Sequence, residues 1–382
     1  MKIIFLCGCL EPGRDGVGDY VRRLAVELQQ QGHRPQVVAL NDYYVTAEET
    51  GTQQTPQGDL LTLRLPATWE MGVRFARAKV WIDDFNPEWL SLQFVPYAFH
   101  TRGAPFQLGK YLLQVGKNRH WHVMIHELWI GMNTNASMQH VWWAKVQRFV
   151  IKRLINQLRP KIIHTHTALY EAHLTKLGFT SQYLPLFSNI PSLTLPAASS
   201  SIVGSSFPPS SKDVSLVLFG FIHPGSPVEL LAQDAAEFAN RYKVLVTLTM
   251  IGRCGSEQDR WAKNWTALGL PVKIMGEQSP SIISKVLLDA SLGIVTTPAL
   301  LLGKSGTAAA MREHGLPVLC VSAPWHARGV HDLLGELDAQ VYQAGRFESY
   351  LAVKPAEIII KLPDIAKQLS ESLLASIYTW RV

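Results

Sequence analysis

Short apolar runs and longer amphipathic segments alternate along the first half of the chain. An apolar run at residues 2–9 is followed by a glycine-containing turn, Gly16-Val17-Gly18, and then by apolar residues at helical spacing up to about residue 31. A second apolar run covers residues 36–40. A strand, a glycine turn, a helix and another strand in this order predict the beginning of a doubly wound parallel sheet, whose ligands bind at the carboxyl ends of its strands.

This pattern continues, stops and then restarts. It predicts strands at residues 89–95, 123–126 and 162–165 and helices at residues 74–84, 106–117 and 139–158. Residues 192–213 are instead rich in Ser, Pro and Ala, which is typical of a surface linker or loop. After them come predicted strands at residues 215–220, 247–252, 272–275, 292–296 and 318–321 and predicted helices at residues 227–242 and 279–289.

We therefore expect an α/β protein of two Rossmann-like, doubly wound parallel-sheet domains with a cleft between them. Residues 1–190 would form the N-terminal domain, residues 191–213 a linker or loop, and residues 214–364 the C-terminal domain. A last helix within residues 365–382 is expected to pack back on the N-terminal domain. A length of 382 residues is too great for one ordinary core and suits this division.

The segment from Leu302 to Val318 indicates an anion site. It follows an apolar run and is expected to form a tight loop and then an Ala-rich helix. The backbone N–H groups of Ser305, Gly306 and Thr307 would lie at the N-terminus of this helix, where Lys304 adds a positive charge. This arrangement favours a bound phosphate, although a capped helix that only packs against a sheet has the same sequence pattern. The segment is not a Walker P-loop, because the first glycine of that motif is absent.

The positive charge of the chain lies in its first half. Residues 1–190 hold 20 of the 36 Lys and Arg residues and 14 of the 30 Asp and Glu residues, which accounts for the whole net charge of +6. No basic-aromatic repeat or helix-turn-helix signature accompanies this charge, so we expect no nucleic acid partner. An anionic membrane surface or an anionic lipid-linked substrate fits the charge better.

One predicted helix combines basic and aromatic residues. They are Trp142, Trp143, Lys145, Arg148, Phe149, Lys152, Arg153 and Arg159. Such a helix suits contact with anionic lipid, and a helix packed on the sheet with a solvated basic face explains the pattern equally well.

The sequence also bears on the compartment. No run of 18 or more uncharged apolar residues is present to span a membrane, and residues 1–10 are interpreted as a buried strand and not as a leader. The four cysteines have no metal-ligand spacing and are expected to be reduced core residues. We expect a cytoplasmic protein, at most peripheral at the inner face of the membrane.

Seven short motifs occur in the order of a known family. They are Lys2–Cys9 leading to Gly16-Val17-Gly18; Val123-Met124-Ile125-His126-Glu127; Pro185-Leu186-Phe187-Ser188-Asn189-Ile190; Leu218-Phe219-Gly220-Phe221; Met250-Ile251-Gly252; Ile274-Met275-Gly276-Glu277; and Thr297-Pro298 ahead of the helix that ends in Gly315-Leu316-Pro317-Val318. Together they resemble the GT-B glycosyltransferases, in particular the retaining, nucleotide-sugar-dependent enzymes of glycosyltransferase family 4, over nearly the whole chain.

The chain diverges from this family at its nucleotide-binding motifs. The two glutamates of the family's Glu-x7-Glu motif align with Leu302 and Ala310. Phe221 stands where the family has an arginine for the diphosphate, with His223 nearby, and His223 or Arg253 could replace that arginine.

The resemblance implies transfer of a hexose from a UDP-sugar, such as UDP-glucose, with retention, to a saccharide or lipid-linked acceptor in polysaccharide or glycoconjugate synthesis. It implies no cofactor and no metal. His126 would contact and orient the donor sugar, and Lys304 would hold the diphosphate; these are the expected catalytic residues. The other expected donor-binding residues are Gly16, Val17, Gly18, Gly220, His223, Arg253, Met275, Ser305, Gly306 and Thr307. Asp19 and Glu127 are candidates on the acceptor side.

Other interpretations compete with these. A surface or capping role explains Asp19 and Glu127, and His164 and His166, which point the same way from one strand, are interpreted as wall residues. The missing glutamates leave open a non-catalytic sugar-nucleotide-binding relative or a GT-B-fold epimerase. A dinucleotide oxidoreductase is disfavoured because Val21 stands where its fingerprint has a third glycine.

Overall fold

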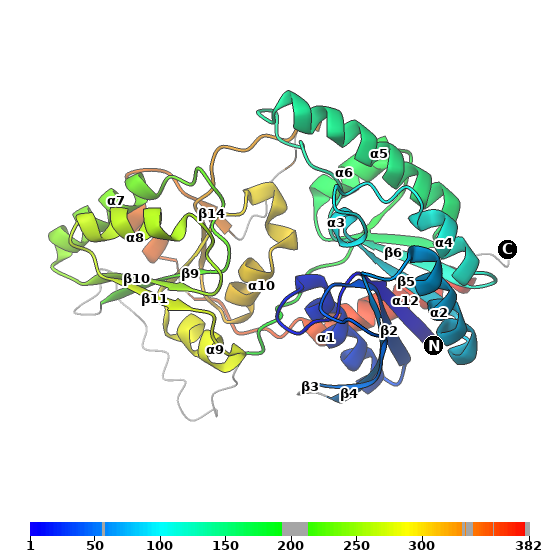
Figure 1. The fold of residues 1–382 in the computed structure, drawn as a ribbon. Helices are drawn as coiled ribbons and strands as arrows, with labels where there is room; N and C mark the ends of the chain where they lie inside the picture. Colours follow the sequence, from blue (N-terminus) through cyan, green and yellow to red (C-terminus); the bar gives the residue numbers. More distant parts are fainter. Residues whose placement is uncertain (56–57, 193–212, 331–332, 334–338, 354, 379–382) are drawn as a thin grey trace. The chain divides into compact units, whose positions relative to one another are not determined.

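The chain divides into two compact α/β units. The computed structural model describes residues 1–55, 58–192, 213–330, 333, 339–353 and 355–378, so the predicted linker at 191–213 lies almost entirely outside the described residues. The first unit comprises Met1–Pro185, His326–Asp332 and Leu362–Val382, and the second comprises Leu186–Trp325 and Leu333–Lys361. Each unit is described by itself below (Figure 1).

The first unit is built on an eight-stranded sheet. Its strands are β1 (Lys2–Cys7), β2 (Arg34–Asp42), β3 (Glu49–Thr55), β4 (Gly58–Pro66), β5 (Trp89–Phe94), β6 (His120–Ile125), β7 (Ile162–Thr165) and β8 (Gln182–Tyr183). The strand order is β3-β4-β2-β1-β5-β6-β7-β8, and every pair is parallel except β3 with β4. The order reverses direction between β1 and β5, where a doubly wound sheet opens a crevice for ligands.

The first unit also contains helices, and all of them except the last connect strands of this sheet. They are α1 (Gly16–Gln30), α2 (Met71–Phe85), α3 (Pro96–Phe99), α4 (Leu108–Val115), α5 (Met138–Leu158), α6 (Ala168–Lys176) and α12 (Leu362–Tyr378). Because crossovers between parallel strands are right-handed, the reversal of strand order places α1 on one face of the sheet and α2, α4 and α5 on the other. Helix α12 packs beside α1, and α4 packs beside α5 (Figure 1).

The second unit has a six-stranded sheet that is parallel throughout. Its strands, in the order β11-β10-β9-β12-β13-β14, are β9 (Val214–Phe219), β10 (Val246–Ile251), β11 (Val272–Gly276), β12 (Leu292–Val295), β13 (Val318–Cys320) and β14 (Ala339–Val341). Its helices are α7 (Val228–Tyr242), α8 (Gln258–Ala267), α9 (Pro280–Asp289), the 3-10 helix η1 (Ala299–Lys304), α10 (Gly306–Glu313) and α11 (Phe347–Leu351). The order reverses between β9 and β12.

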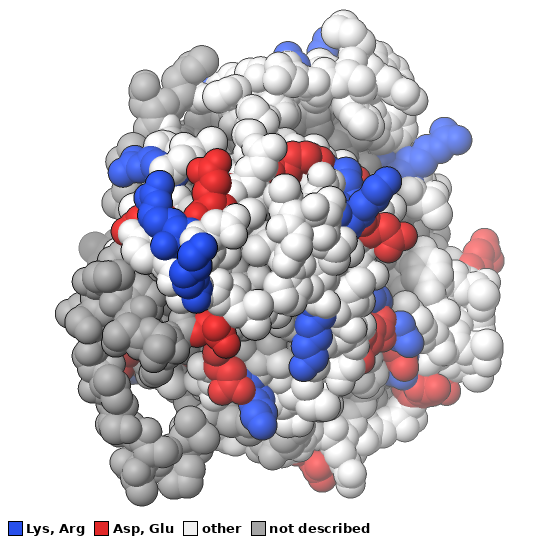
Figure 2. Space-filling model, turned by 90° about the vertical axis from the view of Figure 1, so that its left-hand side faces the viewer, with Lys and Arg blue, Asp and Glu red and all other residues white. Residues whose placement is uncertain are grey.

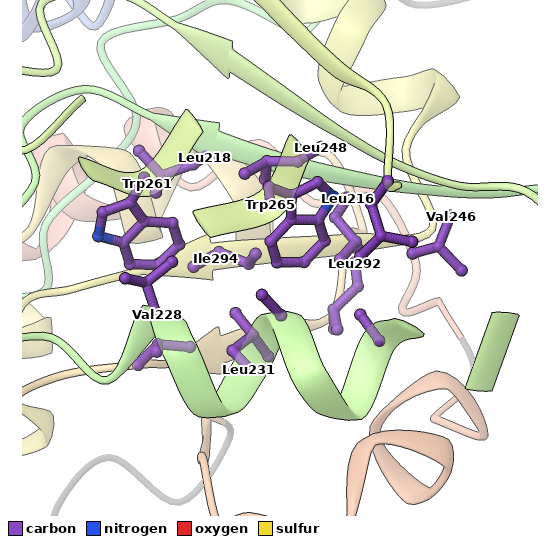
Figure 3. Packing of buried hydrophobic residues seen from close by; sticks show 14 of the residues in the cluster. Leu216, Leu218, Val228, Leu231, Val246, Leu248, Trp261, Trp265, Leu292 and Ile294 are labelled. Carbon is purple, nitrogen blue, oxygen red and sulfur yellow. The ribbon is translucent and has the colours of Figure 1, made fainter. Parts of the chain in front are cut away.

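Alternation along these strands produces two apolar layers in the second unit. On one face, Leu216 and Leu218 of β9 pack with Trp261 and Trp265 of α8 and with α7, as Figure 3 shows. On the other face, Val217 and its neighbours pack with α9, η1 and α10. Both tryptophans are fully buried. Burying both faces of a parallel sheet explains why its strands are almost continuously apolar.

The predicted doubly wound organisation is confirmed, and the predicted strands are present within about three residues at their ends. The hairpin β3–β4 is an addition that the apolar pattern does not reveal, because β3 has the sequence Glu-Thr-Gly-Thr-Gln-Gln-Thr and is mostly exposed. One short segment of the later chain belongs to the first unit. There, Thr134 N–H donates to His326 C=O and Arg328 N–H donates to Met132 C=O.

Candidate functional site

In the second unit, the predicted donor-binding residues gather at the carboxyl edge of the sheet. Gly220 and His223 follow β9, and Lys304 to Thr307 follow β12, so these residues flank the point where the strand order reverses. Arg253 follows β10 and Met275 lies at the end of β11, farther along the same edge. This is the part of a doubly wound sheet where ligands bind.

The segment around Lys304 differs from the expected tight loop. It forms the 3-10 helix η1, which ends at Lys304, and α10 begins at Gly306. Ser305 is the N-cap of α10: its hydroxyl accepts a hydrogen bond from Ala308 N–H at 3.3 Å, and its own N–H donates to Leu302 C=O at 2.9 Å. The prediction that Ser305 N–H is open to a ligand is therefore wrong, because η1 uses it.

The first turn of α10 approaches the end of β9 closely. Gly220 has φ +81°, and a Cβ at this position would lie 2.8 Å from Cγ2 of Thr307. Only glycine fits this backbone conformation and this space without strain. Gly220 therefore serves the packing of β9 against α10, which brings the Thr307 side of the helix N-terminus next to the strand end.

His223 lies in the same group. Its N–H donates to Thr296 Oγ1 at 2.9 Å, and Nδ1 lies 3.2 Å from the same oxygen. Burial, and then the positive charge of Lys304, lower the pKa of His223 below its ordinary value. His223 is therefore neutral at pH 7 and can accept or donate a hydrogen bond, but it adds no charge beside Lys304. Nothing in the sequence marked Thr296 as its partner.

The two positions of the missing glutamates are apolar and closed. Leu302 and Ala310 are both buried in the cluster around α10. The carboxylate nearest in sequence, Glu313, is also buried and accepts a hydrogen bond from Ser188 N–H at 2.7 Å. It holds the segment that follows Pro185 against α10.

Arg253 and Met275 have protein partners. Arg253 Nε lies 3.0 Å from Glu277 Oε1, with both side chains about half exposed. Such an exposed ion pair contributes about 0–1 kcal/mol and does not fix the arginine. The main-chain oxygen of Met275 accepts a hydrogen bond from Gln278 Nε2 at 2.6 Å, which uses one of its two lone pairs.

In the first unit, the turn Gly16-Val17-Gly18 begins α1 as expected, but an acidic side chain occupies it. Asp15 is the N-cap and accepts hydrogen bonds from Val17 N–H at 2.8 Å and from Gly18 N–H at 3.2 Å. A Cβ on Gly18 would lie 2.6 Å from Cys9 C=O, so this glycine allows α1 to approach the end of β1. A phosphate at this turn would have to displace the Asp15 carboxylate. Sequence reasoning missed Asp15, although Asp before a helix is a common N-cap signal.

The two acceptor-side candidates also differ in their surroundings. Asp19 accepts a hydrogen bond from Gly13 N–H at 3.0 Å and pairs with Arg22, which in turn donates to Leu10 C=O. It therefore organises the loop before α1. Glu127 directly follows His126 at the carboxyl end of β6 and is half-buried. Roles of both residues toward an acceptor stay predictions.

His126 lies at the carboxyl end of β6, but both of its ring nitrogens contact protein groups. Nε2 lies 2.9 Å from Gln93 Oε1, and Nδ1 lies 3.2 Å from His166 Nε2. Tyr20 of α1 meets the ring edge-on, with centroids 5.0 Å apart. Because His126 is only 7% exposed, a sugar hydroxyl would have to exchange with one of these partners. Gln93 was not predicted, and His166 was interpreted as a wall residue.

Within the described part of the chain, no three His, Cys, Asp or Glu side chains come together in a way that could hold a metal ion. This includes the histidines beside His126, whose ring nitrogens bind other protein groups. The four cysteines are buried and form no disulfide.

Comparisons with known proteins place the fold. No protein-family model and no curated protein sequence matches the chain. Among solved structures, Anabaena HepE in complex with UDP and glucose is 14% identical, with a TM-score of 0.59 over 98% of this chain and 100% of that one. The pneumococcal O-GlcNAc transferase GtfA in complex with UDP and GlcNAc is 10% identical, with a TM-score of 0.54 over 99% of each chain.

A third similar structure is an epimerase. The UDP-GlcNAc 2-epimerase from Neisseria meningitidis bound to UDP-GlcNAc is 10% identical, with a TM-score of 0.51 over 98% of this chain and 100% of that one. At these identities the likenesses establish the fold alone. The GT-B fold predicted from the sequence is thereby confirmed.

Proposed function

We propose that this protein is a GT-B glycosyltransferase that transfers a hexose from a UDP-sugar to a saccharide or lipid-linked acceptor, with retention at the anomeric carbon. The observation that carries the proposal is the group formed by Lys304, the N-terminus of α10 and the end of β9, held together where the strand order reverses. The likeness in fold of this chain to HepE and GtfA, both crystallised with UDP, supports UDP as the nucleotide.

The chemistry of this group suits a departing diphosphate. Breaking the bond between the anomeric carbon and the diphosphate leaves more negative charge on the phosphate oxygens than the donor carries. Lys304 and the first N–H groups of α10 would stabilise that charge in the transition state more than in the ground state. Neutral His223 would add a hydrogen bond without a further charge. His126 would orient the donor sugar, as the resemblance to family 4 implies.

An epimerase acting on a UDP-sugar is the second candidate. The likeness to UDP-GlcNAc 2-epimerase favours it, and the buried apolar residues at the two glutamate positions set the chain apart from the transferase family it resembles. Both candidates need a UDP-sugar and differ in whether an acceptor is required. Incubation of UDP-glucose and UDP-GlcNAc with and without saccharide acceptors, followed by NMR of the products, distinguishes transfer from epimerisation.

Binding of UDP should raise the melting temperature of the purified protein more than binding of ADP or GDP at the same concentration. A ligand that binds only the folded state stabilises it by RT ln(1 + [L]/Kd), about 2.7 kcal/mol at one hundred times Kd. A thermal-shift panel of the three nucleotides and their glucose derivatives measures this. Equal shifts for all three would contradict uracil selectivity, and no shift for any would contradict a nucleotide-sugar site.

We also propose that α5 contacts an anionic membrane that presents the acceptor. Met138, Trp142 and Phe149 are 60–82% exposed on this helix. Positions 138, 142, 145, 149 and 152 fall at alternating spacings of four and three, so Lys145 and Lys152 share their face. The helix contains no acidic residue. Exposed apolar and basic side chains on one face are typical of helices that lie in the membrane interface.

Charge reversal on α5 should weaken binding to anionic vesicles. Each basic residue near the surface contributes about 1 kcal/mol, so the double variant Lys145→Glu, Lys152→Glu should bind phosphatidylglycerol-containing vesicles at least about tenfold more weakly. Co-sedimentation measures this, with pure phosphatidylcholine vesicles as the uncharged reference. Equal binding of variant and parent protein would contradict the proposal.

The second unit offers a matched control. Figure 2 views the molecule from the side on which α7 and α8 lie in Figure 1, and there basic and acidic side chains are interspersed. The double variant Lys263→Glu, Lys285→Glu changes the net charge equally at two exposed sites of this unit and should bind the vesicles like the parent protein.

No helix among the described residues is both long and apolar enough to span a bilayer.

A further inference from the structure

A continuous hydrogen-bonded network of buried polar side chains crosses three neighbouring strands of the first unit. Its six members share one face of the sheet, since Ser91 lies opposite His122 and Met124 lies opposite His164, and side chains two residues apart point the same way. The members are Ser91 and Gln93 of β5, His122 and His126 at β6, and His164 and His166 at β7. None is more than 7% exposed.

Hydrogen bonds connect all six. In order, His164 Nδ1 lies 3.0 Å from His122 Nε2, His122 Nδ1 lies 2.7 Å from Ser91 Oγ, Ser91 Oγ lies 2.7 Å from Gln93 Nε2, Gln93 Oε1 lies 2.9 Å from His126 Nε2, His126 Nδ1 lies 3.2 Å from His166 Nε2, and His166 Nδ1 lies 2.8 Å from Leu184 C=O. Buried polar groups connected in this way specify one arrangement of their side chains.

The acceptors at the two ends of the His126–His166 pair determine its hydrogens. Leu184 C=O and Gln93 Oε1 can only accept, so His166 Nδ1 and His126 Nε2 must both donate. The contact between the two rings requires a third hydrogen. Two neutral imidazoles carry two ring hydrogens in total. With Gln93 Oε1 toward His126, the pair therefore holds one extra hydrogen and one positive charge.

Turning the Gln93 amide would remove this requirement. Gln93 Nε2 would then donate to His126 Nε2, His126 Nδ1 would donate to His166 Nε2, and His166 Nδ1 would still donate to Leu184. Each ring would carry one hydrogen. The orientation of one amide thus decides the charge of the pair.

The other members of this group of hydrogen-bonded side chains, His164, His122 and Ser91, accommodate neutral imidazole rings in either orientation of the Gln93 amide. Burial, and then His164, lower the pKa of His122 well below its ordinary value, and burial lowers the pKa of His164 to about 4. Ser91 can accept from Gln93 while it donates to His122, or the reverse. The extra hydrogen therefore belongs to His126 and His166. Tyr20 of α1 lies edge-on to both rings, at 5.0 and 5.6 Å between centroids.

We propose that Gln93 is a positioning residue for His126: its amide oxygen holds His126 Nε2 as a hydrogen-bond donor and thereby keeps one extra ring hydrogen on the His126–His166 pair. Two oxygens that accept from opposite ends stabilise the charged form of the pair. The catalytic meaning of this extra hydrogen, for the contact of His126 with the donor sugar, rests on the proposed function. The number of ring hydrogens on the pair is independent of the proposed function.

The test is NMR of the full chain with 15N-labelled histidine. Ring nitrogen shifts distinguish an imidazolium from the two neutral tautomers, and His126→Gln and His166→Gln assign the signals. At neutral pH we expect one imidazolium pattern, or an average over the two rings. Gln93→Leu should abolish it, whereas Gln93→Glu, which keeps an acceptor oxygen, should retain it to higher pH than the parent protein. Two neutral rings with Nδ1–H in the parent protein would overturn the proposal.

Further variants separate this inference from the proposed function. Ser91→Ala interrupts the hydrogen-bond network beyond Gln93 and should leave the imidazolium pattern in place. If Gln93→Leu does not fold, the Gln93→Glu spectrum still decides, because neutral rings in that variant contradict the proposal. In the activity assay, Gln93→Leu should lower kcat/KM for the UDP-sugar about tenfold or more, the effect of one charge-assisted hydrogen bond, and Gln93→Glu should restore most of it. A parent protein without transfer activity refutes the proposed function and leaves the spectra interpretable.

Discussion

Replacing Lys304 by alanine should weaken the binding of UDP by about 10- to 150-fold and leave the binding of uridine almost unchanged. A hydrogen bond between charged groups contributes about 1.5–3 kcal/mol, and each 1.4 kcal/mol is a factor of ten in affinity. Uridine lacks the phosphates and should not sense the change. Isothermal titration calorimetry with both ligands measures the difference.

Two control variants sharpen this experiment. Lys304→Arg keeps a positive charge and should retain most of the affinity for UDP, whereas Lys285→Ala removes an exposed lysine of α9 and should change nothing. Equal losses for UDP and uridine in Lys304→Ala would mean that the lysine only maintains the structure of η1 and α10. In that case the diphosphate site would have to lie elsewhere.

Replacing Gly315 by alanine should destabilise the second unit by about 2–5 kcal/mol, through two separate costs. Gly315 has φ +71°, which costs an alanine roughly 1–2 kcal/mol. A Cβ would also lie 2.4 Å from the main-chain oxygen of Ala356. The N–H of Ala356 in turn donates a hydrogen bond to Gly315 C=O. Backbone cannot move aside as a flexible side chain does, and overpacking of this kind costs about 1–3 kcal/mol. Urea unfolding midpoints measure the change.

Gly269 provides the matched comparison. Its φ is +73°, but no atom of the described residues, its chain neighbours aside, lies within 4 Å of the position of a Cβ. Gly269→Ala should therefore show only the conformational cost, and the difference between the two variants gives the cost of the contact with Ala356. Equal destabilisation by the two substitutions would contradict the close approach. A large effect confined to Gly315 would explain the glycine of the Gly-Leu-Pro-Val motif by packing alone.

Much of the fold follows from the apolar pattern because both sheets, apart from the antiparallel β3–β4 pair, are parallel and have apolar residues buried on both faces. Strands such as β6 and β12 are short runs of almost entirely buried residues, which the apolar pattern identifies as strands. Elements with few buried positions escape this reasoning. Helix α8 buries only Trp261 and Trp265, four residues apart, and it was not predicted.

The candidate site could be predicted only where function and local sequence coincide. Lys304 and the start of α10 are adjacent in the chain, so their proximity is fixed by a helix terminus. The pairing of His126 with Gln93 depends instead on the register of β5 against β6, which no local pattern encodes. The capture of the α1 N-terminus by Asp15 depends on one side-chain rotamer. Such contacts need tertiary structure.

The path of the chain limits how the protein can be taken apart. The backbone leaves the second unit after Trp325, pairs Ala327 with Asn133 in the first unit, and rejoins the second unit at Leu333. A fragment spanning residues 186–361 would carry this segment without Asn133, the residue that Ala327 pairs with. A fragment ending at residue 185 would lack α12, which packs beside α1. Separate expression of the first unit therefore requires His326–Asp332 and Leu362–Val382 to be joined to residues 1–185. A single proteolytic cut between residues 185 and 186 would leave both units incomplete.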